Sequence, residues 1–278
     1  MDIPDDFEKF CVVFWNVNNK DLTDSVCALA SSTGTDALVL NENSVSSGRT
    51  LAALQREVSS DFYIPGTRSE ERFHCFCRSP RFDMSELHSS RRTSMRKCEI
   101  GSVGVLLILV HGLDIRNNDE QIRQQYVHLL ARDVSSAKKL HNTNNLVLLG
   151  DFNMNPYDRP MNLAAGFNAM MTRKCVTPGY RTFQDERYDF YYNPMWGLFG
   201  DKNPGPAGTV YDISNQGPYG WSMIDQVLIH HSIVGLFNDV AIVTEAGTVS
   251  LMDENGRPDS KNRSDHFPIR VTFRWRKS

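Results

Sequence analysis

The fold of this chain is decided by the stretch Asn144-Asn145-Leu146-Val147-Leu148-Leu149-Gly150-Asp151-Phe152-Asn153-Met154-Asn155-Pro156. Its apolar run at 146–149 predicts a buried strand, and Gly150 allows a sharp turn at the end of that strand. Asp151 and Asn153 follow, where sheets present ligand-binding groups beyond their carboxyl edge. A carboxylate there can orient or deprotonate water, and an amide can hold an oxyanion. The alternative is a simple turn, because Gly, Asp and Asn are common turn residues.

The composition is that of a globular protein. The 278 residues are 40% hydrophobic and 10% aromatic, which is ample for a sizeable core and excludes a disordered or fibrous chain. The net charge of -3 provides no global attraction to nucleic acid or to an anionic membrane. A polyanionic ligand would therefore need a metal ion or a local basic patch.

The sequence also predicts a reducing, cytoplasmic location. Six cysteines are too sparse for a disulfide scaffold, and residues 1–6 are acidic where a secretory signal would be basic and then apolar. The longest apolar run, 103–110, is too short to cross a bilayer, so we expect no membrane insertion.

Strand-like and helix-like segments alternate along the chain, which favours an α/β layered fold. Buried strands are predicted at 11–15, 36–40, 103–110 and 146–149, and further strands at 62–64, 73–77, 82–87, 208–213, 221–229, 237–244 and 271–275. Helices are predicted at 21–31, from Ser46 or Ser47 to about 58, and from a cap at Asn118 or Asp119. The last has apolar residues at helical spacing: Ile122, Tyr126, Leu129, Leu130, Val134 and Ala137.

The domain organisation is predicted to be simple. Residues 158–220 show little periodicity and indicate long loops over one rim of the fold, with a short helix near 191–199. Because no repeat or linker divides the chain, we expect one domain over 1–278 with its core at about 10–275.

Polar groups stand at six strand ends. Such positions are usually apolar, because unpaired charge is costly at a buried sheet edge. Converging oxygen ligands suit Mg²⁺ or Mn²⁺, and histidines beside them suit phosphate oxygens. The pattern therefore indicates metal-assisted phosphoester hydrolysis. The groups are Asn16, Glu42, His111, Asp151 with Asn153, Asp225, and Asp265 with His266.

These residues resemble, in order and spacing, the motif series of the endonuclease/exonuclease/phosphatase superfamily. The matching motifs are Trp15-Asn16, Asn41-Glu42, Gly150-Asp151-Phe152-Asn153, Ile224-Asp225 and Ser264-Asp265-His266, within residues 11–273. The resemblance implies a deoxyribonuclease I-like, four-layer α/β sandwich. Two mixed β-sheets would pack face to face with helices on the outside, and the active site would lie at one edge.

The resemblance also implies a role for each metal-site residue. Glu42 would be the main metal ligand, helped by Asn16 and, directly or through water, by Asp265. Asp151 would orient or deprotonate the attacking water, and Asn153 would bind the phosphate or the water.

The histidines would contact the substrate. His266 would bind non-bridging phosphate oxygens, and Asp225 would fix its tautomer and charge. His111 resembles a histidine of the deoxyribonuclease-like and sphingomyelinase-like branches, and would make a second phosphate contact or protonate the leaving group. Its carboxylate partner is not evident from the sequence, and Glu99 is one candidate.

The chain departs from the family pattern at two neighbours of these motifs. Asn41 stands where the family usually has Gln, so the support of the metal-binding acid is expected to differ. Met223 stands where many members have Arg, and His111 replaces a usual tyrosine. Both argue against the abasic-site branch.

Further polar and aromatic groups have competing interpretations. Residues 89–97, which include Arg91, Arg92, Arg96 and Lys97, form either a solvated loop or a phosphate-contacting arm. His230-His231 suggests a metal site but fits a structural role better, and alternation along a strand explains His74, Cys75 and Cys77 better than a zinc site with Cys98. Loop aromatics would either pack the loop or stack on a substrate: Tyr188, Phe190, Tyr191, Tyr192, Trp196 and Tyr219.

The sequence therefore predicts a Mg²⁺-dependent phosphodiester hydrolase, with Mn²⁺ as a possible substitute. We expect a nuclease acting on DNA in preference to RNA, and the basic segment 91–97 is the feature that favours nucleic acid. One alternative is a phosphatase or phosphodiesterase acting on a lipid, an inositol phosphate or a nucleotide. Another is a non-catalytic scaffold that binds a phosphorylated partner.

Overall fold

Two mixed sheets lie face to face in the middle of the computed structural model, which describes residues 7–66, 72–78, 82, 84–200, 203–214 and 220–276. Sheet A runs in the order β16 (Phe237–Ile242), β19 (Ile269–Arg276), β1 (Phe7–Asn16), β2 (Ala37–Asn41), β4 (Phe73–Arg78) and β3 (Phe62–Tyr63). Sheet B runs in the order β5 (Met84–Ser89), β6 (Thr93–Ile100), β7 (Val103–His111), β8 (Leu146–Asp151), β15 (Asp225–His230), β12 (Tyr191–Tyr192) and β9 (Ala169–Met170).

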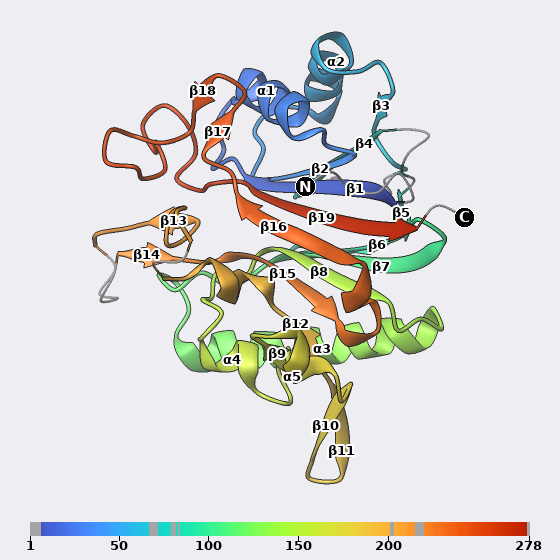
Figure 1. The fold of residues 1–278 in the computed structure, drawn as a ribbon. Coiled ribbons are helices and arrows are strands. Elements are labelled where there is room, and N and C mark those ends of the chain that lie inside the picture. Colours follow the sequence, from blue (N-terminus) through green and yellow to red (C-terminus); the bar gives the residue numbers. More distant parts are fainter. Residues whose placement is uncertain are drawn as a thin grey trace.

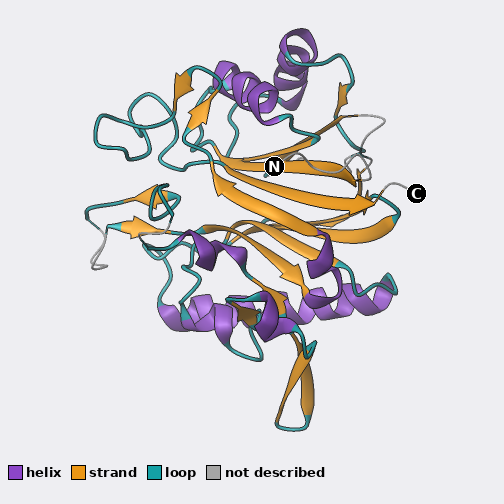
Figure 2. Ribbon diagram, viewed as in Figure 1, coloured by secondary structure: helices purple, strands orange, loops and turns teal. Residues whose placement is uncertain are grey.

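Helices cover the outer face of each sheet (Figures 1 and 2). On sheet A lie α1 (Thr23–Thr33) and α2 (Ser47–Glu57), and on the side of sheet B lie α3 (Glu120–Leu140), α4 (Arg159–Asn162) and α5 (Arg173–Val176). The four-layer sandwich predicted from the sequence is thus confirmed. None of the helices in the described residues combines the length and apolar character that a membrane crossing requires.

Central strands are apolar throughout because both of their faces are covered. In β1, Val12 and Phe14 join the core between the sheets, whereas Val13 and Trp15 join the core beneath α1 and α2. Strand β8 divides its leucines and valine in the same way between the central core and the core beneath α3. This double burial is why the strands read as continuous apolar runs in the sequence.

Helix caps occur where the sequence predicts them. The Ser46 hydroxyl accepts a hydrogen bond from the Arg49 amide at 3.4 Å, and the Asp119 carboxylate accepts one from the Ile122 amide at 2.8 Å. The predicted apolar face of α3 is only partly right, because Ile122 and Leu129 are 46% and 40% exposed. The helix needs a narrower buried stripe, since only one side of it meets the sheet.

Residues 158–220 hold more regular structure than expected. Strands β9 and β12 extend sheet B, and a hairpin of β10 (Tyr180–Phe183) and β11 (Glu186–Asp189) projects from the body (Figure 1). Its two-residue turn uses Gln184 and Asp185 at φ of 49° and 64°, a turn without a glycine signal. The short helix near 191–199 is a 3-10 helix, η1 (Pro194–Leu198).

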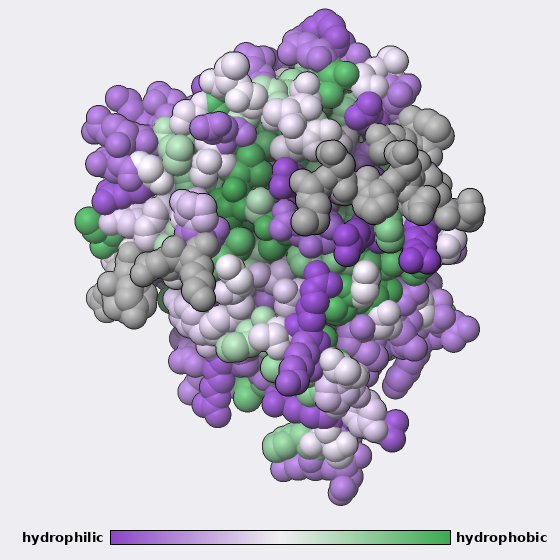
Figure 3. Space-filling view, in the orientation of Figure 1, coloured by the Kyte–Doolittle hydropathy of each residue, from purple (hydrophilic) through white to green (hydrophobic). Residues whose placement is uncertain are grey.

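The remaining short elements lie near the sheet ends or on the rim. Strand β13 (Val210–Tyr211) pairs with β14 (Trp221–Ser222), and β17 (Glu245–Ala246) pairs with β18 (Val249–Ser250). A 3-10 helix, η2 (His231–Leu236), follows β15. In the space-filling view, hydrophilic residues cover most of the two helical layers, and apolar surface is concentrated in the middle of this face, over the sheets (Figure 3).

The basic segment is not the loop that the sequence suggested. Residues 93–97 belong to β6, which pairs with β5 on one side and β7 on the other. Arg96 is fully buried, where its Nε donates to Ser94 Oγ at 3.1 Å and its Nη2 lies 3.6 Å from Glu86 Oε2. A buried ion pair leaves no hydropathy signal, so the sequence showed only the positive charge.

Because loss of the Arg96 guanidinium deprives the buried Glu86 of that cation, we expect Arg96→Met to lower the free energy of unfolding by about 3 kcal/mol. Arg91→Met is the matched control, since Arg91 is exposed, and it should change stability by less than about 0.5 kcal/mol. Urea denaturation of both variants measures the difference. Equal midpoints for the two variants would show that the pair contributes nothing.

Candidate active site

Strand pairing brings the polar strand ends together. In sheet A the parallel strands β1 and β2 place Asn16 opposite Asn41. In sheet B, β7 and β8 place His111 opposite Asp151, and the antiparallel strand β15 places Asp225 opposite Asp151 on the other side. The ends of β1, β2, β7 and β8 therefore lie level with the start of β15.

Two hydrogen bonds connect the sheets at this edge. Asn16 Nδ2 donates to Asp151 Oδ2 at 3.2 Å, and Asn41 Nδ2 lies 2.7 Å from His111 Nδ1. All four side chains are buried. The polar ends of the two sheets thus form one network, which joins residues that are widely separated in the chain.

The Gly150-Asp151-Phe152-Asn153 stretch makes a turn that holds its acid in the network. Gly150 has φ of 151°, and a Cβ there would lie 2.0 Å from the Val110 carbonyl oxygen. The Asn153 amide donates to Asp151 Oδ1 at 2.8 Å, and Arg123 from α3 donates to the Asn153 carbonyl. The stretch is therefore a turn, as its residue types suggested, and the turn fixes the Asp151 carboxylate at the strand end.

Gly150→Ala is expected to lower the free energy of unfolding by about 3 kcal/mol, because the new methyl group would overlap a backbone carbonyl that cannot move away. Gly48 of α2 has open space around its Cα, so Gly48→Ala serves as the control and should raise stability by about 0.5 kcal/mol. Thermal and urea unfolding of both variants tests this. A Gly150→Ala protein as stable as the parent would contradict it.

The second histidine, His266, is held by hydrogen bonds to residues of both sheets. His266 Nδ1 lies 2.8 Å from Asp225 Oδ2, and Trp15 Nε1 donates to the His266 carbonyl at 2.9 Å. Ser264 Oγ donates to the Asn16 carbonyl at 2.6 Å and accepts from the His266 amide at 3.0 Å. These bonds fasten the Ser-Asp-His segment to the end of β1.

Asp151, Asp225 and His266 form a compact titratable cluster, with one ligand atom from each residue within 4.8 Å of the others. Burial, together with the Asp225 carboxylate, raises the pKa of Asp151. Burial alone would lower the pKa of His266, but Asp225, with Asp151 and Asp265, raises it to about 10. His266 is therefore an imidazolium near neutral pH, and its charge compensates the buried acids.

His111 has the opposite character. Burial, then the Arg72 and Arg92 cations, lower its pKa to about 3, so it is neutral. Arg72 Nη1, which can only donate, lies 3.0 Å from Nδ1 and 3.4 Å from Nε2, and Asn41 Nδ2 also faces Nδ1, so these contacts favour the tautomer with its proton on Nε2. His111 Nε2 lies 3.5 Å from Glu42 Oε1.

The carboxylate beside His111 is therefore Glu42 and not the Glu99 suggested by the sequence. Glu99 pairs with Gly104 near the start of β7, whereas His111 ends that strand. The two residues therefore lie near opposite ends of β7. The sequence alone does not give the pairing register of β6 and β7, so it could not show this separation.

The three predicted metal ligands differ in how free their oxygens are. Glu42 Oε2 accepts from Asn19 Nδ2 at 3.1 Å, and Glu42 keeps part of its side chain exposed. Asp265 Oδ1 is buried with no hydrogen-bond partner among the described residues, as is Asp225 Oδ1. Asn16 Oδ1 accepts from the Asn18 amide at 3.0 Å, so here Asn16 positions Asp151. Asp265 Oδ1 lies 4.0 Å from His266 Nε2, and carboxylate oxygens that accept no hydrogen bond in the described residues fit a hard divalent cation.

Only part of the basic segment reaches the site. Arg92 Nη1 donates to the Gly112 carbonyl at 2.8 Å, next to His111. Arg91 and Lys97 are exposed, whereas Arg96 lies in the core and is not available to a phosphate. Arg72 and Arg123 are site residues that sequence reasoning missed. Neither belongs to a motif, and their contacts span 39 and 30 residues.

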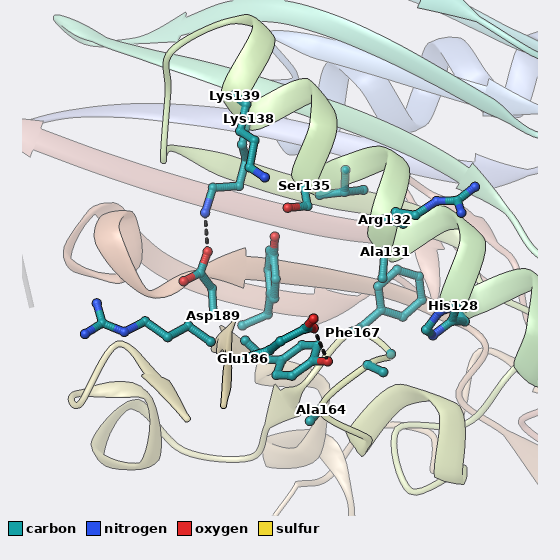
Figure 4. Close-up of a pocket in the computed structure, with 16 residues that line it drawn as sticks. His128, Ala131, Arg132, Ser135, Lys138, Lys139, Ala164, Phe167, Glu186 and Asp189 are labelled. Carbon is teal, nitrogen blue, oxygen red and sulfur yellow. Dashed lines mark hydrogen bonds and ion pairs between the residues drawn. The ribbon is translucent and has the colours of Figure 1, made fainter. Parts of the chain in front are cut away.

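His230 and His231 lie far from this cluster. Asp225 and His230 are the two ends of β15, and His230 Nε2 lies 3.3 Å from Asp189 Oδ2, a carboxylate that also binds the Lys138 ammonium. A cavity of about 480 Å³ opens beside this ion pair, between α3 and β11 (Figure 4). None of the predicted site residues lines it.

The cysteines considered for a zinc site and several of the loop aromatics pack within the protein. Cys75, Cys77 and Cys98 belong to the apolar core between the sheets. Of the loop aromatics, Phe190 and Tyr191 are buried, and Trp196 contacts Tyr157 and Phe199. Tyr219 lies outside the described residues.

Comparison with known proteins agrees with this architecture. A sequence model of the Endonuclease/Exonuclease/phosphatase family matches residues 13–266. A family protein from Bacteroides thetaiotaomicron is similar in structure, with a TM-score of 0.59 and 15% identity over 98% of this chain and 100% of that one. No curated protein sequence matches significantly.

Two further structures of similar fold contain DNA. TDP2 from D. rerio, complexed with a single strand DNA product, has a TM-score of 0.58 and 14% identity over 96% of this chain and 99% of that chain. The 3′ phosphatase NExo from Neisseria, bound to a product DNA hairpin, has a TM-score of 0.53 and 18% identity over 96% and 100% of the two chains. At such identities the likeness establishes the fold.

Proposed function

Because the chain belongs to the endonuclease/exonuclease/phosphatase family, whose members are phosphoric ester hydrolases, we propose that it is a divalent-metal-dependent phosphodiester hydrolase, a nuclease acting on DNA. The observation that carries the proposal is the joining of Asp151, Asp225 and His266 in one buried cluster at the edge of both sheets. The DNA complexes of two proteins with this fold support the choice of substrate.

The acid and the imidazolium have complementary roles in the proposed reaction. Asp151 accepts a proton from the attacking water or orients it, and its raised pKa suits a proton acceptor that works near neutral pH. His266 directs its Nε2 proton to a non-bridging phosphate oxygen, while Asp225 holds its Nδ1. The charge of the imidazolium compensates the acids and attracts the phosphate.

Asn153 and His111 supply further contacts. Asn153 Nδ2 now donates weakly to the Gly112 carbonyl at 3.3 Å and can turn to the phosphate. As a neutral ring with its proton on Nε2, His111 donates a hydrogen bond to a second phosphate oxygen. With a pKa of about 3 it is poorly suited to protonate the leaving group.

Glu42, helped by Asp265 and Asn16, would hold Mg²⁺, or Mn²⁺ in its place. The fit rests on their oxygen-donor chemistry and on one oxygen each of Asp265 and Asp225 that accepts no hydrogen bond within the described residues. A bound divalent cation neutralises phosphate charge and stabilises the charge that builds up as the ester bond breaks. The Glu42 side chain is 24% exposed and is therefore accessible from solvent. A cytoplasmic location remains part of the proposal.

The purified protein should hydrolyse DNA with Mg²⁺ and lose that activity in EDTA. Plasmid, single-stranded DNA, RNA and bis(p-nitrophenyl) phosphate form the substrate panel. If the small ester is hydrolysed but none of the nucleic acids is, the nuclease assignment fails, and a phosphodiesterase that acts on small or lipid substrates is favoured. If no substrate is hydrolysed at high protein concentration, a phosphate-binding scaffold replaces the enzyme as the proposed function.

A further inference from the structure

The short hairpin β13–β14 is hydrogen-bonded to residues of the proposed catalytic cluster and to their chain neighbours. The Thr209 carbonyl accepts from the Phe267 amide at 2.8 Å, and its hydroxyl accepts from the Asp225 amide at 3.2 Å. Val210, the first residue of β13, bridges to His266. Hairpin β13–β14 therefore starts at the cluster, and Tyr211 is the first side chain beyond it.

An aromatic series leads outward from the cluster along this hairpin. Phe267, next to His266, stacks on Trp221 with ring centres 6.5 Å apart, and Trp221 meets the edge of Tyr211 at 5.2 Å. Phe267 is buried, whereas Trp221 and Tyr211 are only partly buried. The outer two rings thus keep part of their surface accessible, while Trp221 also packs against the core beneath α1 and α2.

A cation lies on the outer ring. Arg257 comes from the long connection between β18 and β19, which lies beside β13 and β14 at the same end of the sheets in Figure 1. Its Cζ is 3.9 Å from the centre of the Tyr211 ring. Its backbone is fixed by Asp253, but within the described part of the chain its guanidinium has no carboxylate within 4 Å. The donor edge of the guanidinium is therefore available to a ligand.

The hairpin is also held from the opposite side. Arg116, in the loop that follows His111, pairs with Asp212 at 3.3 Å. Residues from two separate connections, Arg116 and Arg257, thus contact the first part of the hairpin, at Asp212 and Tyr211.

We propose that Tyr211, Trp221 and Arg257 form a base-stacking subsite for the nucleotide next to the scissile phosphate, which makes single-stranded nucleic acid the substrate class. This assignment rests on the phosphodiester hydrolysis proposed above. Nucleic-acid bases stack on aromatic rings and on guanidinium planes, and bases are free to do so only when they are unpaired. Inositol offers no π face, and acyl chains would need an apolar groove in place of a cation on a ring.

The test compares a single-stranded oligodeoxynucleotide with the same strand made entirely of base-free tetrahydrofuran residues. The parent protein should cleave the strand with bases with about tenfold higher kcat/KM. Tyr211→Ala should remove that preference, Tyr211→Phe should keep it, and Arg257→Lys should reduce it, because lysine keeps the charge but not the plane. Tyr180→Ala is the matched control, since Tyr180 bears Arg187 in the same way at 4.4 Å on the remote hairpin β10–β11.

Binding to the same labelled strands in EDTA, followed by fluorescence anisotropy, separates this subsite from the hydrolysis. If nothing is cleaved but Tyr211→Ala still weakens binding about tenfold, the hydrolase proposal fails and the subsite stands. Equal cleavage and binding of the two strands by the parent protein would overturn the subsite while leaving the hydrolase intact. A base preference that survives in Tyr211→Ala, or faster hydrolysis of phosphoinositide vesicles than of DNA, would overturn it as well.

Discussion

Asp151→Asn is expected to lower kcat by about 10³-fold at neutral pH, because the amide cannot accept a proton from the attacking water. The change keeps the shape of the side chain and removes one of two carboxylates that face each other on β8 and β15. Since Asp225 raises the pKa of Asp151, the ionised form carries an unfavourable interaction that the variant lacks. The amide nitrogen, however, cannot accept the hydrogen bond that Asn16 Nδ2 or the Asn153 amide donates to Asp151 in the parent. Because these two effects oppose each other, we expect the melting temperature to stay close to that of the parent.

Single-turnover cleavage of DNA and calorimetry of the same sample measure both effects. Asp185→Asn is the matched control, because Asp185 is exposed in the turn of the projecting hairpin and its left-handed φ of 64° also suits asparagine. A loss of activity that comes with a loss of folded protein would mean that Asp151 acts through structure. Retained activity would remove Asp151 from the proposed mechanism.

His266→Gln should lower kcat by about 10²-fold or more, because the neutral amide can still donate a hydrogen bond but lacks the positive charge directed at the phosphate. It should also destabilise the protein, since Asp151 and Asp225 lose the cation between them.

The activity of the parent protein should rise with pH as Asp151 ionises and fall as His266 loses its proton at a pKa of about 10. The variant should lack the fall.

The stability effect has a defined pH dependence. The pKa of His266 is raised on folding from 6.5 to about 10, so its contribution is complete below about pH 6.5 and is lost progressively as pH rises through 10. The difference in melting temperature between parent and His266→Gln should therefore shrink between neutral pH and pH 10. A constant difference across that range would show that His266 is not protonated in the folded protein.

The polar strand ends were predictable because a buried strand appears in the sequence as an apolar run, and a functional residue appears as a polar residue that interrupts or ends such a run. Asp151, Asp225 and His266 each interrupt or adjoin an apolar run, and such breaks are costly without a function. The hairpin β10–β11 and strand β6 were missed for the converse reason. Their exposed or ion-paired residues do not alternate in polarity, so the period-two pattern of a strand is absent.

The pairing of Asp225 with His266 was implied by the family resemblance and is present at 2.8 Å, but other partners of the site residues could not be predicted. Nothing local connects Arg72 to His111 or Arg123 to Asn153, because those contacts depend on how strands and helix α3 are stacked. The same holds for Glu42, which only the meeting of sheet A with sheet B brings beside His111.

By itself, the sequence determined an α/β layered fold and the set of polar strand ends, because each is recorded in local patterns of apolar runs, caps and interrupting acids. The four-layer arrangement was implied by the family resemblance that those strand ends carry. Apart from the Asp225–His266 pair, only the tertiary structure decided which of these groups meet, and it decided what charge the two histidines carry. It made His266 an imidazolium and His111 a neutral ring, although both are histidines at the edge of the same site. The physical reason is that a pKa depends on burial and on nearby charges, and those neighbours come from the opposite sheet and from distant parts of the chain.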